Sequence, residues 1–391
     1  MDIARLFVIW SSGDPAGLPL ANLVARHFDD AEESRAFGGI RIPVFVRYEA
    51  LAPPATAPRP IVLDEAEHNL VVVVGTHHIA DRLADDPAWA DWFDDLSAQF
   101  KRRGRKDKFV VLSLESSVLE VTGFRGRNAI RAFQWPFDLE SADSRTHLLL
   151  LLTNMCGSMI LENPGAAKPG EARRAPKQRL FISHAKLDGA DDAVRIRRRL
   201  DETDFGIEPF VDANDLSVGE MFSEELEGEI ADATLLAIHT DAYGSRPFCR
   251  WEILRAKFHH RPIYIVHRLK QGEGRVFPYG GNAPLMVVID LNDQTIDKIL
   301  LAAMTVVLRG LVWSRLADTV IAGKNLTNAP LTLARTPELV DLAHIKMRKS
   351  GPFPSMIVYP DPPLSDEERE LIPALDLGIE VVSLSELEVM K

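Results

Sequence analysis

The stretch LFISHAKLD, residues 180–188, begins with a short apolar run and passes directly into a polar loop. Short apolar runs of this kind are typical of parallel strands that are buried on both faces of a sheet. Four similar runs follow, and segments with helical spacing lie between them. Their alternation predicts a doubly wound α/β domain with a parallel sheet. The expected strands are 179–183, 207–212, 234–240, 262–267 and 285–289, and the expected helices are 190–202, 222–231, 247–258 and 294–316.

The first third of the chain repeats this scheme. Arg5-Leu6-Phe7-Val8-Ile9 is similar to Arg179-Leu180-Phe181-Ile182, and NLVVVVG at 69–75 matches the run at 234–240. Two explanations remain open at this point: an internal duplication, or two unrelated domains that share an architecture. The other expected strands here are 42–47, 109–114 and 128–134, followed by a closing apolar helix at 146–160.

The segment ENPGAAKPGEARRAPK, residues 162–177, is rich in Pro, Gly, Ala and charge and has no apolar periodicity, so we expect a linker there. It separates a domain at 1–161 from one at 178–316. A small α/β extension is expected at 317–391, and it either packs on a neighbouring element or senses a small ligand. Its expected elements are strands 331–333, 355–359 and 380–384 and a helix at 366–372 capped by Ser365.

Composition restricts the class of protein. The net charge of −12 argues against a broad basic face for nucleic acid. Two cysteines exclude a disulfide framework and a Cys-based zinc site, and they fit a reducing cytosol. The N-terminus has no basic region before its apolar stretch, which indicates a first strand rather than a signal peptide. We therefore expect a cytoplasmic protein that neither enters a membrane nor binds nucleic acid directly.

Three polar segments carry the expected chemistry. Besides residues 180–188 they are FVDANDLSVGE at 210–220, a strand ending in a carboxylate-rich loop, and SRPFCRWE at 245–252, where a loop enters a helix. Parallel sheets bind ligands beyond the carboxyl ends of their strands, so we expect the three loops at one edge.

In this order and spacing the three segments resemble the TIR family: its first strand, its BB loop and the Ser-x-x-x-Cys-x-x-Glu motif of its NAD⁺-cleaving members. The resemblance implies a flavodoxin-like TIR domain, with a second TIR-like domain before it. It implies an NAD⁺ glycohydrolase that yields ADP-ribose or its cyclic form, with NAD⁺ as substrate and with neither cofactor nor metal. It also implies a bacterial protein of antiphage defence or signalling, and it assigns the catalytic role to Glu252.

A single glutamate suits this reaction. Breaking the bond between nicotinamide and ribose develops positive charge on the ribose, which a fixed carboxylate stabilises. Glycoside hydrolysis normally needs a second carboxyl group to protonate the leaving group. Nicotinamide leaves a pyridinium cation as a neutral molecule and needs no such acid. The plain alternative for Glu252 is a solvated glutamate in the first turn of a helix, where the helix dipole favours it.

The remaining site assignments are weaker. Ser245 either contacts the ribose or caps the helix, Trp251 either stacks on a base or packs, and His184 is either a ligand or a satisfied loop histidine. Lys186 is the candidate for the pyrophosphate. No GxGxxG loop follows the first strands, which disfavours dehydrogenase chemistry. The expected substrate-binding residues are Ser183, His184, Lys186, Asp212, Ser245, Phe248, Cys249 and Trp251.

The BB loop contains Asn214, Asp215 and Gly219, which permit special backbone angles. In TIR assemblies this loop docks onto a neighbouring TIR domain and completes the site. The resemblance therefore implies a homo-oligomer held by TIR–TIR contacts, with an activating nucleotide or partner protein as the expected trigger.

The first domain has no match to the catalytic residue. Aligning Pro87 with Pro247 places Trp92 where Glu252 stands, and a shift of one residue offers only Asp91. We expect this domain to be non-catalytic and to serve as a sensor or a dimerisation surface. Two rival functions remain for the whole chain: a non-catalytic TIR adaptor in signal transduction, and a nucleoside-transferring enzyme that acts on smaller substrates.

Overall fold

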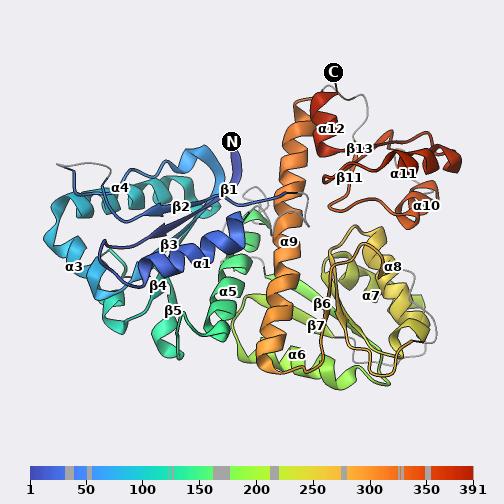
Figure 1. Ribbon diagram of the computed structural model, residues 1–391, viewed down its shortest axis with the longest axis horizontal. Helices are drawn as coiled ribbons and strands as arrows, with labels where there is room; N and C mark the ends of the chain where they lie inside the picture. The colour runs from blue at the N-terminus through green and yellow to red at the C-terminus, as the bar shows by residue number, and fades with distance from the viewer. Residues whose placement is uncertain are drawn as a thin grey trace. The chain divides into compact units, whose positions relative to one another are not determined.

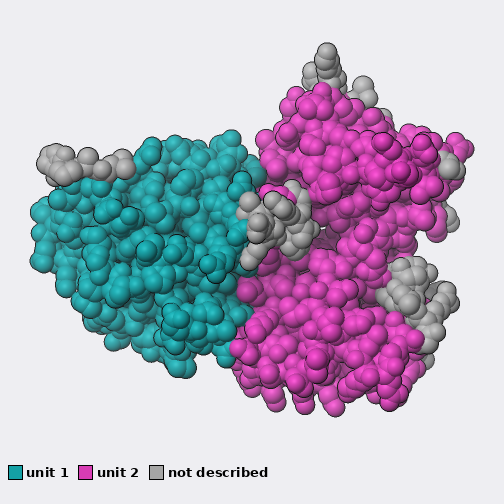
Figure 2. All heavy atoms as spheres, in the orientation of Figure 1, with its two compact units in different colours: residues 1–35, 40–176 teal, residues 36–39, 177–391 magenta. Residues whose placement is uncertain are grey.

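The computed structural model describes residues 1–30, 39–50, 55–121, 123–125, 127–161, 177–211, 220–273, 280–324, 326, 330–347 and 354–390. The chain forms two compact units, coloured separately in Figure 2. The first unit comprises residues 1–35 and 40–176, and the second comprises residues 36–39 and 177–391. Each unit is described by itself.

The first unit is a parallel sheet with strand order β2-β1-β3-β4-β5. Helices α1 (Gly17–Asp29) and α5 (Ala142–Leu161) cover one face (Figure 1). Helices α3 (His77–Asp85) and α4 (Pro87–Arg103) cover the other face and enclose its core. The strands are β1 (Asp2–Ile9), β2 (Val44–Arg47), β3 (Ala66–Gly75), β4 (Lys108–Ser113) and β5 (Asn128–Arg131).

The second unit contains a parallel sheet of order β7-β6-β8-β9-β10, which is the same 2-1-3-4-5 arrangement. Helices α7 (Glu220–Ala231) and α8 (Pro247–Phe258) pack on one face, and α6 (Ala190–Glu202) and α9 (Asp293–Ala322) lie on the other (Figure 1). Both sheets therefore confirm the predicted flavodoxin-like fold. The strands are β6 (Gln178–His184), β7 (Ile207–Val211), β8 (Thr234–His239), β9 (Ile263–His267) and β10 (Leu285–Val287).

The two sheets also share side-chain pairs at matching positions. Phe7 stacks on its register partner Phe45 with ring centroids 5.4 Å apart, and Phe181 stacks on its partner Phe210 at 5.3 Å. In both β1 and β6, an arginine lies two residues before the phenylalanine and is ion-paired with a glutamate. The pairs are Arg5 with Glu65, and Arg179 with Glu229. A shared architecture alone does not require the same pairs, so these matches favour an internal duplication.

Several expected elements have different ends. The helix expected at 146–160 begins earlier, at Ala142. The strand expected at 128–134 stops at Arg131, and Ala132–Gln134 forms a 3₁₀ turn leading to Trp135 and Pro136. The helix expected at 294–316 continues to Ala322, because its apolar spacing continues past Leu316 with the buried Ala317.

Helix α9 is the one helix in the described part of the chain that is long and apolar enough to cross a membrane by length and composition. Half of its most apolar window is buried inside the protein. It packs on α6 and β9, and its buried Asp297 forms a bidentate ion pair with Arg199 of α6. Packing against the sheet accounts for its apolar side chains.

The C-terminal part of the second unit forms a small parallel sheet, β11-β12-β13. Ser365 caps α11 through a capping box, as predicted. This part packs on α8, where the ammonium group of Lys257 is ion-paired with Glu338 and the ring of Phe258 stacks on His344. Its elements are β11 (Leu331–Thr332), α10 (Leu339–Met347), β12 (Met356–Tyr359), α11 (Asp366–Leu371), β13 (Glu380–Ser383) and α12 (Leu384–Val389).

Candidate functional site

Glu252 lies in the second turn of α8 and is only 4% exposed. It is therefore not the solvated first-turn glutamate that was the alternative. The hydroxyl of Ser183, at the carboxyl end of β6, donates a hydrogen bond to its carboxylate. The hydroxyl of Tyr243 lies 2.6 Å from the same Ser183 oxygen. A serine has one proton to donate, so Tyr243 must donate to Ser183. The three side chains form a relay that ends on the carboxylate.

The surroundings of Glu252 keep its neighbours neutral. Burial raises the pKa of Tyr243 well above its usual range, and the nearby Cys249 and Glu252 add to the effect. Burial, followed by the charge of Glu252, also raises the pKa of the Cys249 thiol. That thiol donates to the carbonyl oxygen of His184 at 3.5 Å. Tyr243 thus stays protonated and can donate a hydrogen bond. Cys249 stays a thiol that lines the site and does not act as a nucleophile.

The structure brings Ser183, His184, Cys249 and Glu252 together, as the three-segment pattern predicts. Phe248 and Trp251, with ring centroids 5.6 Å apart, pack against the core under α7 and α8, and Arg255 lies over the indole. Packing is therefore the observed role of Trp251.

Ser245 does not cap α8, because the N-cap residue is Arg246 and it makes no side-chain cap hydrogen bond. The Ser245 hydroxyl is exposed and donates to the carbonyl oxygen of Ala242, so the capping alternative is wrong and contact with the ribose stays a prediction. Lys186 is half-buried in the turn after β6. Asp212, Asn214, Asp215 and Gly219 lie outside the described residues.

Sequence reasoning missed two residues. Tyr243 is fully buried in a 3₁₀ turn, but the letters DAYGS read only as a loop. Asp188 accepts hydrogen bonds from the Thr240 hydroxyl at 2.7 Å and from the backbone amide of Ala242 at 2.9 Å. It thereby holds the loop after β6 against the loop after β8. Its position in the first segment is the signal that could have identified it. Within the described ranges, no group of three His, Cys, Asp or Glu side chains could hold a metal ion.

The corresponding positions of the first unit are apolar. Helix α4, like α8, begins with proline at its first turn, and five residues later Trp92 stands where α8 has Glu252. Ile9 takes the place of Ser183 at the end of the first strand. Both side chains belong to one hydrophobic core, with Ile9 fully buried and Trp92 9% exposed. The first unit therefore has no counterpart of the Ser183–Glu252 pair.

Comparison with known proteins identifies a domain family in part of the chain. The family model of the TIR domain matches residues 180–300, which include both Ser183 and Glu252. No curated protein matches the chain. Among solved structures, the TIR domains of the activated Roq1 resistosome, which directly recognises the pathogen effector XopQ, are 15% identical; the match covers 37% of this chain and 99% of that one, with a TM-score of 0.20. PH0766 from Pyrococcus horikoshii OT3 is 11% identical, over 79% of this chain and 65% of that one, with a TM-score of 0.28. At these scores the strand order, rather than either structure, defines the fold.

Proposed function

Because residues 180–300 form a TIR domain, we propose that this chain hydrolyses NAD⁺ at the bond between nicotinamide and ribose, with Glu252 as the catalytic carboxylate. The observation that carries the proposal is the relay from Tyr243 through Ser183 to the buried Glu252. It fixes one carboxylate at the edge of the sheet where parallel α/β folds bind ligands.

The chemistry follows from that carboxylate. As the bond breaks, its electron pair leaves with nicotinamide, which becomes neutral, and positive charge develops on the ribose. Glu252 stabilises this charge, and the poorly solvated surroundings strengthen the attraction. Water then adds to the ribose carbon and releases one proton, so that NAD⁺ and water give nicotinamide, ADP-ribose and H⁺. Attack by the adenine of the same molecule instead of water would give the cyclic product.

The Ser183 hydroxyl also fixes the direction of the carboxylate. It donates to one of the carboxylate oxygens, Oε2. We propose that a ribose hydroxyl of the substrate donates to the same carboxylate. By keeping its donor in place, the relay fixes the carboxylate before the ribose arrives, so little reorganisation is needed in the transition state.

The proposal extends to the setting of the reaction. From the family resemblance we infer activation by TIR–TIR self-association, with NAD⁺ as substrate and no cofactor, in bacterial antiphage defence or signalling in the cytoplasm. Each of these inferences rests on the resemblance to bacterial TIR proteins that carry the Ser-x-x-x-Cys-x-x-Glu motif.

A second candidate function is a non-catalytic TIR adaptor. The observation that favours it is the 4% exposure of Glu252, which is also what a structural carboxylate satisfied by Ser183 would show. The two candidates differ in turnover. An adaptor releases no nicotinamide, whereas the enzyme loses its activity when Glu252 loses its charge.

The test is incubation of the full chain with NAD⁺ over a range of protein concentrations, with particle mass followed by light scattering. Nicotinamide, ADP-ribose and cyclic ADP-ribose are separated by chromatography. We expect nicotinamide release in the self-associated fractions, its loss in Glu252→Gln, and its retention in Glu208→Gln, which changes an exposed glutamate of β7. If the self-associated wild type releases none, the chain is an adaptor. If Glu252→Gln releases as much as the wild type, Glu252 is not the catalytic carboxylate.

A further inference from the structure

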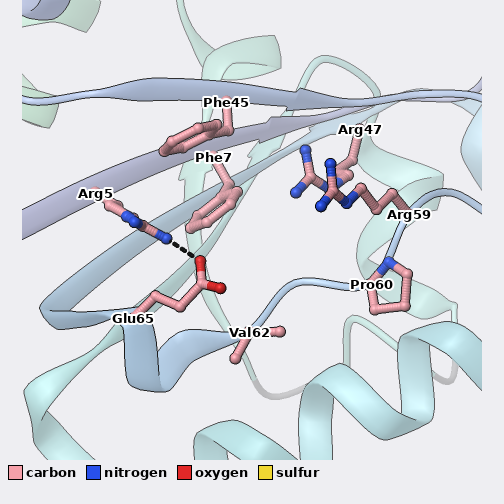
Figure 3. A pocket seen from close by; sticks show the side chains of 8 residues that line it. All are labelled: Arg5, Phe7, Phe45, Arg47, Arg59, Pro60, Val62 and Glu65. Atoms are coloured by element: carbon pink, nitrogen blue, oxygen red, sulfur yellow. Dashed lines mark hydrogen bonds and ion pairs between the residues drawn. The ribbon is translucent and has the colours of Figure 1, made fainter. Parts of the chain in front are cut away.

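The first unit contains a cavity of about 200 Å³ on the α4 side of its sheet, over strands β1 and β2 (Figure 3). The stacked rings of Phe7 and Phe45 form its floor, and residues 59–65 form the facing wall with Pro60 and Val62. None of these residues belongs to the TIR domain at 180–300.

The two ends of the cavity differ in charge. At one end, Arg5 is ion-paired with both Glu65 and Asp2, so its positive charge is compensated. At the other end, Arg47 and Arg59 lie side by side (Figure 3). Among the described residues, no carboxylate is ion-paired with either of them. The cavity therefore carries two positive charges at one end, and the charge of Glu65 in the same lining only partly offsets them at Arg47.

Arg47 shows the energetic cost of this arrangement. One of its terminal nitrogens donates to the carbonyl oxygen of Val46 at 2.8 Å, but its Nε is buried without a hydrogen-bond partner. Burial, followed by the charge of Arg59, lowers the pKa of Arg47. A buried donor without a partner destabilises the empty site, and an anion beside the guanidinium group would offset part of that cost.

The matching positions of the two sheets differ in charge here. Phe45 corresponds to Phe210, so two residues further on Arg47 corresponds in sequence to Asp212. The first unit thus carries an arginine at the end of its second strand where the TIR domain has an aspartate. Arg47 is paired in register with Ile9, at the carboxyl edge of the sheet where α/β folds bind ligands.

We propose that this cavity binds a small phosphate monoester, with the phosphate between Arg47 and Arg59 and an apolar or aromatic group against Phe7, Pro60 and Val62. A phosphate dianion matches two positive charges, and its oxygens suit the planar donors of guanidinium groups. The cavity is too small for a polymeric ligand. This site is separate from the NAD⁺ chemistry and makes the first unit a ligand-binding module.

The test is isothermal titration of the full chain with phenyl phosphate, inorganic phosphate and phenol. Phenyl phosphate supplies both parts of the expected ligand and lacks the nucleoside that the TIR domain would recognise. We expect saturable binding of phenyl phosphate that is tighter than binding of inorganic phosphate, and none of phenol. Equal affinity for the two phosphates would contradict the role of the apolar wall.

Variants locate the site. Losing a charge-assisted hydrogen bond should weaken binding by roughly tenfold or more, so we expect this for Arg47→Gln and for Arg59→Gln. Arg26→Gln, an exposed arginine of α1 on the other face of the sheet, is the matched control, and Glu252→Gln should bind as the wild type does. Arg59 is exposed, so its replacement should leave the thermal unfolding midpoint unchanged. The proposal is overturned by absence of saturable binding at millimolar phenyl phosphate, or by equal affinity of the wild type and Arg59→Gln.

Discussion

The hydroxyl of Ser183 donates a hydrogen bond to the carboxylate of Glu252, although 69 positions separate the two residues in the chain. The parallel sheet brings them together, because Ser183 lies next to the last residue of β6 and the neighbouring strand β8 leads through a short turn into α8. Tyr243, in that turn, completes the relay from the other side. The geometry of Glu252 is therefore set by the fold of the whole domain.

Ser183→Ala should lower the rate of NAD⁺ cleavage. A hydrogen bond to a charged group contributes about 1.5–3 kcal/mol, so we expect a decrease in kcat of roughly tenfold to a hundredfold. Steady-state kinetics of nicotinamide release measure it. Thr319→Val, which removes an exposed hydroxyl from α9, is the control. An unchanged kcat in Ser183→Ala would show that the relay does not support the reaction.

Trp92→Glu should destabilise the first unit without creating a second active site. Trp92 packs against Trp89 and Phe93, so its loss costs about 3–5 kcal/mol and also buries an unpaired carboxylate. Urea unfolding measures this loss. Asp91→Glu, at the exposed neighbouring position, should leave stability unchanged. Nicotinamide release by Trp92→Glu in a Glu252→Gln background would refute the assignment of the first unit as non-catalytic.

Glu338→Gln should destabilise the second unit more than Lys257→Met does. The side chain of Lys257 is 1% exposed and that of Glu338 is 17% exposed. Removing the carboxylate therefore leaves a buried ammonium group without its ion-pair partner, at a cost of about 3–5 kcal/mol. Removing Lys257 leaves a carboxylate that is still ion-paired with Arg335 at 3.8 Å. Combining the two substitutions should recover part of the loss. Equal losses from the two single variants in chemical unfolding would contradict this ion-pair account.

The same lysine predicts a pH dependence. Burial is the largest influence on the pKa of Lys257 and lowers it from the ordinary value of 10.5. Between the lowered pKa and 10.5 the unfolded chain binds this proton more than the folded protein does, so the free energy of unfolding rises with pH in that window. The free energies of unfolding of the wild type and of Lys257→Met, compared between pH 7 and 10.5, measure this pH dependence. A difference that does not change with pH would count against the shift.

Neither cysteine should react in the native protein at pH 8. Burial raises the pKa of Cys156 to about 12. Burial, followed by the charge of Glu252, also raises the pKa of the Cys249 thiol. Thiolates, not thiols, are the reactive form. Intact-protein mass after iodoacetamide treatment should show no adduct on the folded chain and two on the denatured chain. Rapid labelling of Cys249 in the native state would mean that the site is more open and more polar than the structure shows.

Local patterns predicted much of the fold. The bounds of α6 and α8 agree with the apolar spacing and with Pro247 at the start of α8. Ser183 and Glu252 were identifiable because they lie in two short segments, 180–188 and 245–252, whose residue types and spacing form a pattern. These features depend on residues close together in sequence, which a pattern can capture.

Contacts between distant segments were not predictable in the same way. Tyr243 gave no signal, because its role depends on a hydroxyl 60 residues away. The ion pair of Lys257 with Glu338 joins positions 81 residues apart, and charged residues are read by default as solvent-exposed. The cavity of the first unit is assembled from two strands and a loop, with Arg47 and Arg59 brought together only by the fold.

The most direct test of the central claim is the separation of kcat from KM for Glu252→Gln in the self-associated full chain. Glutamine keeps the size and the hydrogen-bonding oxygen of glutamate but lacks the charge that stabilises the ribosyl cation. Loss of stabilisation that is specific to the transition state lowers kcat while KM stays nearly constant. We predict a fall in kcat of roughly a thousandfold, as for other electrostatic catalytic groups, with KM for NAD⁺ changed by less than about threefold. A variant whose kcat equals that of the wild type, or whose defect lies in KM alone, would contradict the assignment of Glu252 as the catalytic carboxylate.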